Sequence, residues 1–386
     1  MFNNVVDRRN TSCAKRDETI EKTNIKDIVP LTVADMDFKT SPEIIASMIE
    51  AVNHGIYGYT NISDGYIEAS VNWIKRNYGR IPKDYEVVFC PRIIQAISLI
   101  IQNFTNIGDK VMISTPLYNP IQGAILSNDR LLVSSELVLE NNHYEIDFED
   151  FENIAKSGVK VFICVSPHNP TGRVWSKEEI SKIVSICKKY KIMIVSDEVH
   201  ADFVWKDKFI SFGSFLDEYD NMIICTSPAK TFNVPGLEAS NILIRNDENR
   251  SKFKEILIKA GIHNPNYFCV PAVIAAYNSS YEWLNMLKAN IKDNLLYVKK
   301  FFNEIDGFKV IESEGTFLLW IDYRGLNLSE EEFKNILLKS KVLFNLGSEF
   351  GDGGVGFFRI NVASPKNILE KALLNFKKQI ELEKKS

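Results

Sequence analysis

The segment KVFICVSPHNPTG, residues 160–172, indicates the fold class. Residues 161–165 are all apolar, and their β-branched and aromatic composition predicts a buried strand. The prolines and the glycine of residues 166–172 predict a loop. After this loop, Ser176 and Glu179 form a helix-capping box, and apolar residues follow at helical spacing. A strand, a loop and a helix in this order form the repeating unit of α/β proteins with parallel sheets.

Apolar runs of the same kind recur along the central part of the chain. They do not alternate apolar with polar residues, which is typical of strands that helices cover on both faces. We expect such strands at residues 109–115, 131–137, 160–165, 192–195, 222–226 and 240–244, and a loop that turns into a helix between residues 91 and 104. The pattern therefore predicts an α/β fold around a parallel sheet.

The pattern changes at about Tyr281, which suggests a second domain. Residues 282–305 predict a long helix, and short strand-like pieces at 317–321 and 356–362 precede a basic C-terminal helix. We expect a large domain of residues 46–284 and a smaller α+β domain made of residues 1–45 and 285–386. The length of 386 residues fits two to three domains at about 150 residues each.

Composition and charge exclude several classes of protein. The 46 basic and 50 acidic side chains leave a net charge of −4, so the basic surplus of a nucleic-acid or membrane-surface binder is missing. No run of apolar residues is long enough to span a bilayer. The first residues contain no apolar core typical of a secretory signal, and we expect a cytoplasmic protein.

The six cysteines and five histidines do not form a metal-binding or disulfide pattern. The cysteines lie far apart without a CxxC pair, and no HExxH motif is present. Three of them, Cys164, Cys187 and Cys225, lie inside apolar runs, where a free cysteine packs as a small hydrophobe. We therefore expect buried free thiols and no metal site.

Polar side chains follow three of the expected strands directly. Asn169 follows the first, Asp197 the second and Lys230 the third, with Ser227 three residues before the lysine. Ligands of open α/β sheets bind at the carboxyl ends of the strands, so these side chains should converge on one cleft. A lysine there can form a Schiff base, and an aspartate can keep a pyridinium nitrogen protonated. Any one of them alone could equally be a surface charge, a turn residue or a cap.

The order and the context of these residues resemble one family. SPHNPTG (166–172), SDEV (196–199), SPAKTFN (227–233) and FFRIN (357–361) are similar to four motifs of the fold-type I pyridoxal-phosphate enzymes, the class I/II aminotransferase superfamily. Residues 5–375 take part in the resemblance. PLTVADMDF (30–38), YGY (57–59), DEVHAD (197–202) and KTFNVPGL (230–237) resemble its cystathionine β-lyase or C–S lyase branch, the MalY/PatB group.

The resemblance implies a three-layer transferase fold with a mainly parallel central sheet in its large domain, and pyridoxal 5′-phosphate as the cofactor. Lys230 would form the Schiff base and then act as the catalytic base. Asp197 would pair with the pyridine nitrogen, and Asn169 with the phenolic oxygen of the ring. His200 would lie near that oxygen, and Tyr118 would stack on the ring, although both side chains could instead be ordinary core residues.

The remaining implied roles concern the phosphate and the substrate. The phosphate would lie at the start of a helix at Ile93 and Ile94, where free amides favour an anion, and would contact Ser227. Tyr59 would reach the phosphate of the partner subunit in a two-fold dimer, or else pack within its own subunit. Arg359 would hold the substrate carboxylate, with the backbone around Ala34 and Asp35 nearby.

Two positions depart from the patterns of related enzymes. Aminotransferases similar to the aspartate enzyme have a phosphate-binding arginine eight residues after the lysine, where this chain has Glu238. The lyase branch resembles this chain in lacking that arginine. Arg92 replaces the glycine that usually precedes the paired aliphatic residues of the phosphate loop. Its guanidinium could point to the phosphate or to solvent, and we favour solvent.

The resemblance predicts a lyase that cleaves L-cystathionine or related S-substituted cysteines to pyruvate, ammonia and a thiol. An aminotransferase with the same cofactor residues is the alternative, because elimination and transamination share the removal of the α-proton. A DNA-binding regulator would need an extra basic domain of roughly 60 residues, whereas only ~45 residues precede the core. We therefore expect an amino acid as substrate, a homodimer, and neither nucleic acid nor membrane as a partner.

Overall fold

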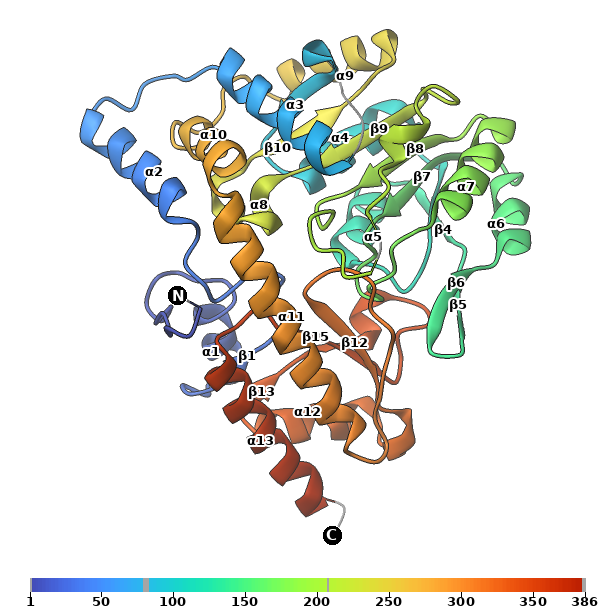
Figure 1. Ribbon diagram of the computed structural model, residues 1–386. Helices are drawn as coiled ribbons and strands as arrows, with labels where there is room; N and C mark the ends of the chain where they lie inside the picture. Colours follow the sequence, from blue (N-terminus) through green and yellow to red (C-terminus); the bar gives the residue numbers. More distant parts are fainter. Residues whose placement is uncertain (1, 79–82, 207, 384–386) are drawn as a thin grey trace.

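A seven-stranded sheet forms the centre of the molecule (Figure 1). A computed structural model describes residues 2–78, 83–206 and 208–383. The strand order is β2-β10-β9-β8-β7-β3-β4. Their bounds are β2 (Val87–Cys90), β3 (Lys110–Ile113), β4 (Leu131–Ser134), β7 (Val159–Val165), β8 (Met193–Asp197), β9 (Met222–Thr226) and β10 (Ser240–Leu243).

The predicted, mainly parallel sheet is confirmed, with differences at β10, β2 and β4. Strands β4, β3, β7, β8 and β9 are parallel, but β10 runs antiparallel to both β9 and β2. We did not predict β2. A short buried run such as β10 has the same composition whether the strand is parallel or antiparallel, so its direction could not be predicted. The expected strand at 131–137 was too long: β4 ends at Ser134, and Leu137 begins a separate hairpin of β5 (Leu137–Glu140) and β6 (His143–Ile146).

Helices cover both faces of this sheet. Alternate strand residues, such as Val161 and Ile163, pack with α4 (Ile93–Phe104), α5 (Asn119–Leu126) and α9 (Asp247–Lys259). Their neighbours, such as Phe162, belong to the core on the other face, with α3 (Asp64–Tyr78), α6 (Phe148–Ala155), α7 (Lys177–Tyr190) and α10 (Cys269–Ser279). Because successive strand residues point to opposite faces, this division produces the three layers. As predicted, Ser176 caps α7 and forms a capping box with Glu179.

A second sheet lies in the C-terminal part, in the order β11-β12-β15-β14. Its strands are β11 (Lys309–Val310), β12 (Leu318–Asp322), β14 (Asn345–Leu346) and β15 (Phe357–Asn361). The helices α11 (Tyr281–Asn303), α12 (Glu330–Lys339) and α13 (Lys366–Glu383) pack around it (Figure 1). The predicted long helix and both strand-like pieces are therefore confirmed.

The N-terminal segment lies against this C-terminal part. Strand β1 (Val29–Pro30) pairs in parallel with β13 (Val342–Leu343), which joins the two ends of the sequence. The N-terminal helices are α1 (Asp17–Thr23) and α2 (Pro42–His54), and α2 packs against α10. The helix α8 (Pro228–Thr231) follows β9, and 3₁₀ turns lie at Asp84–Glu86, Phe212–Phe215, Pro235–Leu237, Arg324–Leu326 and Gly347–Phe350.

The cysteines agree with the expectation of buried free thiols. All six cysteines are free thiols, and five of them, including Cys164, Cys187 and Cys225, are buried. Burial raises the pKa of the Cys90 thiol to about 12, so it stays protonated. Within the described residues, no helix has the length and apolar character needed to cross a membrane.

Candidate active site

Three adjacent parallel strands bring the predicted polar residues to one edge of the sheet. Val165, the last residue of β7, lies opposite Asp197 at the end of β8, and Asp197 lies opposite Cys225 of β9. The loop after β7 contains Asn169, and the helix after β9 contains Lys230. The side chains that we expected to converge therefore leave the sheet at the same edge.

Lys230 lies on the single-turn helix α8, which Ser227 caps. The Ser227 hydroxyl accepts a 3.0 Å hydrogen bond from the Ala229 amide and donates a 2.6 Å bond to the Ala239 carbonyl. Lys230 is partly buried, and its Nζ donates to the Ala34 carbonyl oxygen at 2.5 Å. Burial lowers the pKa of the amine from 10.5 to about 8. The amine can therefore lose its proton near neutral pH and act as a nucleophile or base.

Two charged neighbours shift the pKa of this lysine in opposite directions. The Asp35 carboxylate raises the pKa of Lys230, and the Arg359 guanidinium lowers it. Both effects are smaller than that of burial. The opposite charges therefore partly cancel, and burial remains the main cause of the lowered pKa of Lys230.

Asp197 is a buried carboxylate with little local compensation. Its Oδ1 accepts a 3.1 Å hydrogen bond from the Val199 amide, and no cation among the described residues forms an ion pair with it. Burial raises its pKa from 3.8 to about 6, although Val199 and Lys230 partly oppose this. A carboxylate in such a position is well suited to bind a cationic group of a ligand.

Arg359 lies on β15 and is 4% exposed. Its Nη1 donates to Asn169 Oδ1 at 2.9 Å, and its Nη2 donates to Asn345 Oδ1 at 2.7 Å and to the Thr32 carbonyl at 3.1 Å. The guanidinium stacks 4.9 Å from the centre of the Phe350 ring. Burial lowers its pKa to about 10, which still leaves it cationic at neutral pH.

His200 and Tyr118 lie beside these charged groups. His200 is buried, and its ring meets that of Phe317 edge-on at 5.6 Å. Burial first, and then the charges of Lys230 and Arg359, hold its pKa well below the usual value, so its imidazole is neutral. Tyr118 is 36% exposed, and its amide donates to the Asn169 carbonyl at 3.1 Å. An exposed aromatic face is free to receive a flat ring.

The predicted phosphate loop begins α4. Ile93 and Ile94 are the first residues of this helix, where the backbone amides lack intrahelical partners. Arg92, at the N-cap, is 61% exposed and forms an ion pair with Glu238. The exposed guanidinium agrees with our preference for solvent, but we did not predict Glu238 as its partner. This pair joins the two positions at which the sequence departs from its relatives.

Tyr59 is not brought to the site within one chain. It lies between α2 and α3 and is 100% exposed. Its predicted contact with the phosphate of the partner subunit remains a prediction, because it depends on a second chain.

The site contains residues that we did not predict from the sequence. Asn345 and the Thr32 carbonyl hold Arg359, and two asparagines hold the segment around Ala34. These are Asn233, three residues after Lys230, and Asn361, two residues after Arg359. The short distance of each asparagine from a motif residue was an available signal.

Comparison with known proteins places this site in a family. The model of the family "Aminotransferase class I and II" matches residues 26–374. Cystathionine beta-lyase PatB of Bacillus subtilis is 33% identical over 381 residues, which cover 97% of this chain and 98% of that protein. Cystalysin from Treponema denticola, which contains a pyridoxal 5′-phosphate cofactor, is 31% identical with a TM-score of 0.95 and coverage of 99% and 98%.

One solved structure is more similar in sequence. A PLP-bound protein of Clostridium difficile 630, described provisionally as an aminotransferase, is 40% identical with a TM-score of 0.95. It covers 98% of this chain, which covers 99% of it. The resemblance inferred from the motifs is confirmed, and the chain belongs to the aminotransferase class I and II family.

Proposed function

We propose that this protein is a pyridoxal-phosphate-dependent C–S β-lyase, which cleaves L-cystathionine or a related S-substituted cysteine to pyruvate, ammonia and a thiol. One observation carries the proposal. The buried cluster of Lys230, Asp197 and Arg359 lies in a chain that aligns along almost its whole length with a cystathionine β-lyase.

The side chains present fit the cofactor. Asp197 is a buried anion without a cationic partner among the described residues, and a protonated pyridine nitrogen would supply one. His200 Nδ1 is buried and has no hydrogen-bond partner in the described part of the chain. The lowered pKa of Lys230 favours the free amine that reacts with an aldehyde. Without a ligand, these features cost stability, so they suit a site that is built around one.

We assign the holding residues as follows. Lys230 would bind the aldehyde, Asp197 the ring nitrogen and Asn169 the phenolic oxygen, with His200 next to that oxygen. Tyr118 would cover the ring. Ser227, the amides of Ile93 and Ile94, and Tyr59 of the partner subunit would hold the phosphate.

Pyridoxal phosphate, when bound, supplies a ring that withdraws electrons from the α-carbon of an amino acid. Arg359 binds the α-carboxylate of the substrate, because its guanidinium is cationic and held in place by Asn169 and Asn345. The backbone at Ala34, whose carbonyl accepts from Lys230, and at Asp35 would limit where the substrate can lie. The Lys230 amine then removes the proton from the α-carbon, and loss of the β-thiolate follows.

The aminotransferase alternative shares every one of these residues. The two reactions differ only after the α-proton has gone, when either the β-thiolate leaves or a proton returns elsewhere. Glu238 favours the lyase, because an aminotransferase resembling the aspartate enzyme would have a phosphate-binding arginine there. The provisional description of the Clostridium difficile protein favours the alternative. An assay must therefore separate them.

The test is pyruvate release from L-cystathionine by the purified holoenzyme, with no 2-oxo acid added. We expect stoichiometric pyruvate and thiol over many turnovers. Turnover that appears only when a 2-oxo acid is supplied would establish the aminotransferase instead. A Lys230→Ala variant provides the control, since it keeps the other side chains but loses the base.

Three further assignments belong to this proposal. The exposed Tyr59 supports a two-fold homodimer with shared active sites. The six free thiols suit a reducing compartment such as the cytoplasm. The pairing of β1 with β13 supports a small domain of residues 1–45 and 285–386 beside a large domain of residues 46–284.

A further inference from the structure

The segment Thr32–Phe38 connects the two cations of the proposed active site. The Lys230 amine donates to the Ala34 carbonyl at 2.5 Å. The Arg359 guanidinium donates to the Thr32 carbonyl at 3.1 Å. Since the same short piece of backbone accepts from both side chains, its position sets where each of them lies.

Two asparagines fix this segment from the active-site side. Asn233 accepts from the Met36 amide at 2.9 Å and donates to the carbonyls of Met36 and Phe38 at 3.0 and 2.8 Å. Asn361 donates to the carbonyls of Val33 and Asp35, both at 2.7 Å. The backbone is therefore tied to the chain near Lys230 and to the strand that contains Arg359.

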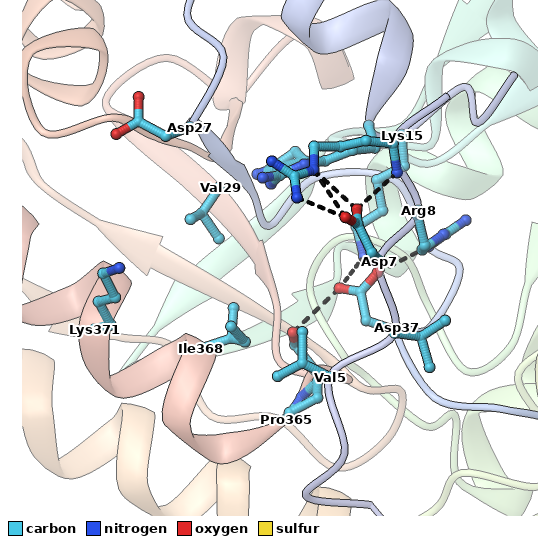
Figure 2. A pocket seen from close by; sticks show the side chains of 15 residues that line it. Val5, Asp7, Arg8, Lys15, Asp27, Val29, Asp37, Pro365, Ile368 and Lys371 are labelled. Carbon is cyan, nitrogen blue, oxygen red and sulfur yellow. Dashed lines mark hydrogen bonds and ion pairs between the residues drawn. The ribbon is translucent and has the colours of Figure 1, made fainter. Parts of the chain in front are cut away.

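Two cations of the N-terminal segment, Arg8 and Lys15, bind the carboxylates of this segment. Arg8 binds Asp35 through two bonds, of 3.1 and 2.5 Å, and also donates to Asp37 Oδ1 at 2.8 Å. Lys15, which is 2% exposed, lies 3.0 Å from Asp37 Oδ2 and 3.4 Å from Asp35 Oδ1. Arg8, Lys15 and Asp37 line a cavity in which both cations meet Asp37 (Figure 2).

Arg8, Lys15, Asp35 and Asp37 form an ionic cluster with two positive and two negative side chains. Burial raises the pKa of Asp37, but Lys15 and Arg8 outweigh this effect, and the net pKa lies below the usual value. Ser364 also donates to Asp37 at 3.1 Å. Removing one cation from a partly buried cluster leaves a carboxylate without its partner, which is costly.

The charges of this cluster also shift the pKa of Lys230. Asp35 raises the pKa of the Lys230 amine, whereas Lys15 lowers it. Arg8 offsets the Asp35 charge by direct contact. The N-terminal cations therefore limit how strongly Asp35 stabilises the charged form of Lys230.

We propose that Arg8 and Lys15 are positioning residues for the active site. They hold Asp35 and Asp37, and thereby keep the segment Thr32–Phe38 in the position where it contacts Lys230 and Arg359. The inference rests on the proposed role of Lys230, but not on which reaction follows. Neither cation touches the substrate in this arrangement. Both act through the Asp35–Asp37 backbone.

The experiment compares Arg8→Gln with Arg9→Gln in the full-length holoenzyme. Arg9 is the matched control, because among the residues that the structure describes it pairs with Asp7 and not with Asp35 or Asp37, and its side chain is 54% exposed. The main readout is the pH midpoint of the absorbance change of bound cofactor, which reports protonation of the Lys230 nitrogen. We expect Arg8→Gln to raise this midpoint by roughly half a pH unit or more, because Asp35 loses a compensating charge. Arg9→Gln should leave it unchanged.

Two further measurements separate positioning from general stability. Arg8→Gln should raise KM severalfold and speed hydrogen exchange of the amides of residues 33–38. Arg8→Lys keeps the charge and should return the midpoint towards the wild-type value. An unchanged midpoint in Arg8→Gln, or an equal shift in Arg9→Gln, would overturn the inference. If the holoenzyme releases no pyruvate yet its midpoint responds to Arg8→Gln, the positioning role stands and the lyase assignment fails.

Discussion

The guanidinium of Arg359 donates a 2.9 Å hydrogen bond to Oδ1 of Asn169, although 190 residues separate them. One residue lies on β15 of the C-terminal sheet and the other follows β7 of the central sheet. The group proposed to bind the substrate carboxylate is thus fixed by the group proposed to face the cofactor. Substrate binding and cofactor binding should therefore respond together to changes at this contact.

The variant Asn169→Asp tests this link. A carboxylate at position 169 would pair with Arg359 and compete with the α-carboxylate of the substrate. We expect KM to rise at least tenfold, since a hydrogen bond to a charged group contributes about 1.5–3 kcal/mol. Steady-state kinetics measure KM. The control is Asn169→Ala, which removes the hydrogen bond to Arg359 without adding a carboxylate that competes with the substrate. If both variants raise KM equally, competition is not the cause.

Lys230→Met should stabilise the apoprotein at neutral pH. The folded chain keeps this amine at a pKa of about 8 instead of 10.5 because burial disfavours its charge. From pH 8 to about 10.5 the unfolded chain retains a proton that the folded chain has lost, so wild-type stability rises with pH in this window. Below pH 8 the penalty is fully present, on the order of 3 kcal/mol.

The measurement is chemical denaturation of both apoproteins at several pH values. The variant should be more stable below pH 8, and its advantage should shrink towards pH 10.5. A constant difference across this range would show that packing, and not the buried charge, distinguishes the two proteins.

The sequence was sufficient to predict that the polar residues after β7, β8 and β9 leave the sheet at one edge. The apolar runs of β7, β8 and β9 lack alternation, so both their burial and their parallel arrangement could be inferred. Because ligands bind at the carboxyl ends of such strands, the positions of Asp197 and Lys230 followed. The direction of β10 did not follow, since this strand pairs antiparallel to β9 and β2 but has the same buried composition.

The contacts that complete the site could not be predicted. Thr32 meets Arg359 from a distant part of the chain, whereas Asn345 lies on the adjacent strand β14, and in both cases a single polar residue has no spacing that marks it. The same holds for Arg8, whose neighbour Arg9 is also an arginine but, among the described residues, pairs with the nearby Asp7. Such contacts depend on how the ends of the chain fold back together, which a linear pattern does not contain.

Asp202 should be important for stability without taking part in the chemistry. It is 7% exposed, and its Oδ2 accepts hydrogen bonds from Thr231 at 2.6 Å, Tyr78 at 3.2 Å and Trp73 at 3.3 Å. Asp202→Ala leaves three buried donors unpaired, and we expect a loss of about 3 kcal/mol or more in the free energy of unfolding. Thr231→Val removes one donor and should cost about 1 kcal/mol. Denaturation of the holoenzymes compares them, and equal losses would contradict the shared role of Asp202.

Tyr59 provides the test of the shared active site. Its side chain is fully exposed in one chain, whereas the Tyr57 hydroxyl donates to the Val52 carbonyl at 2.8 Å. If Tyr59 binds the phosphate of the partner subunit, Tyr59→Phe should weaken cofactor affinity about tenfold, because a hydrogen bond to a charged group is lost. Tyr57→Phe, two residues away, should leave affinity unchanged.

If the protein is the proposed homodimer, its cofactor affinity should also depend on protein concentration. Dilution separates the subunits and removes Tyr59 from the neighbouring phosphate, so cofactor release should follow dissociation in analytical ultracentrifugation with absorbance detection. In Tyr59→Phe, cofactor release should depend less strongly on subunit dissociation. A monomer that retains its cofactor at full affinity would exclude the shared site and show that Tyr59 is an ordinary surface residue.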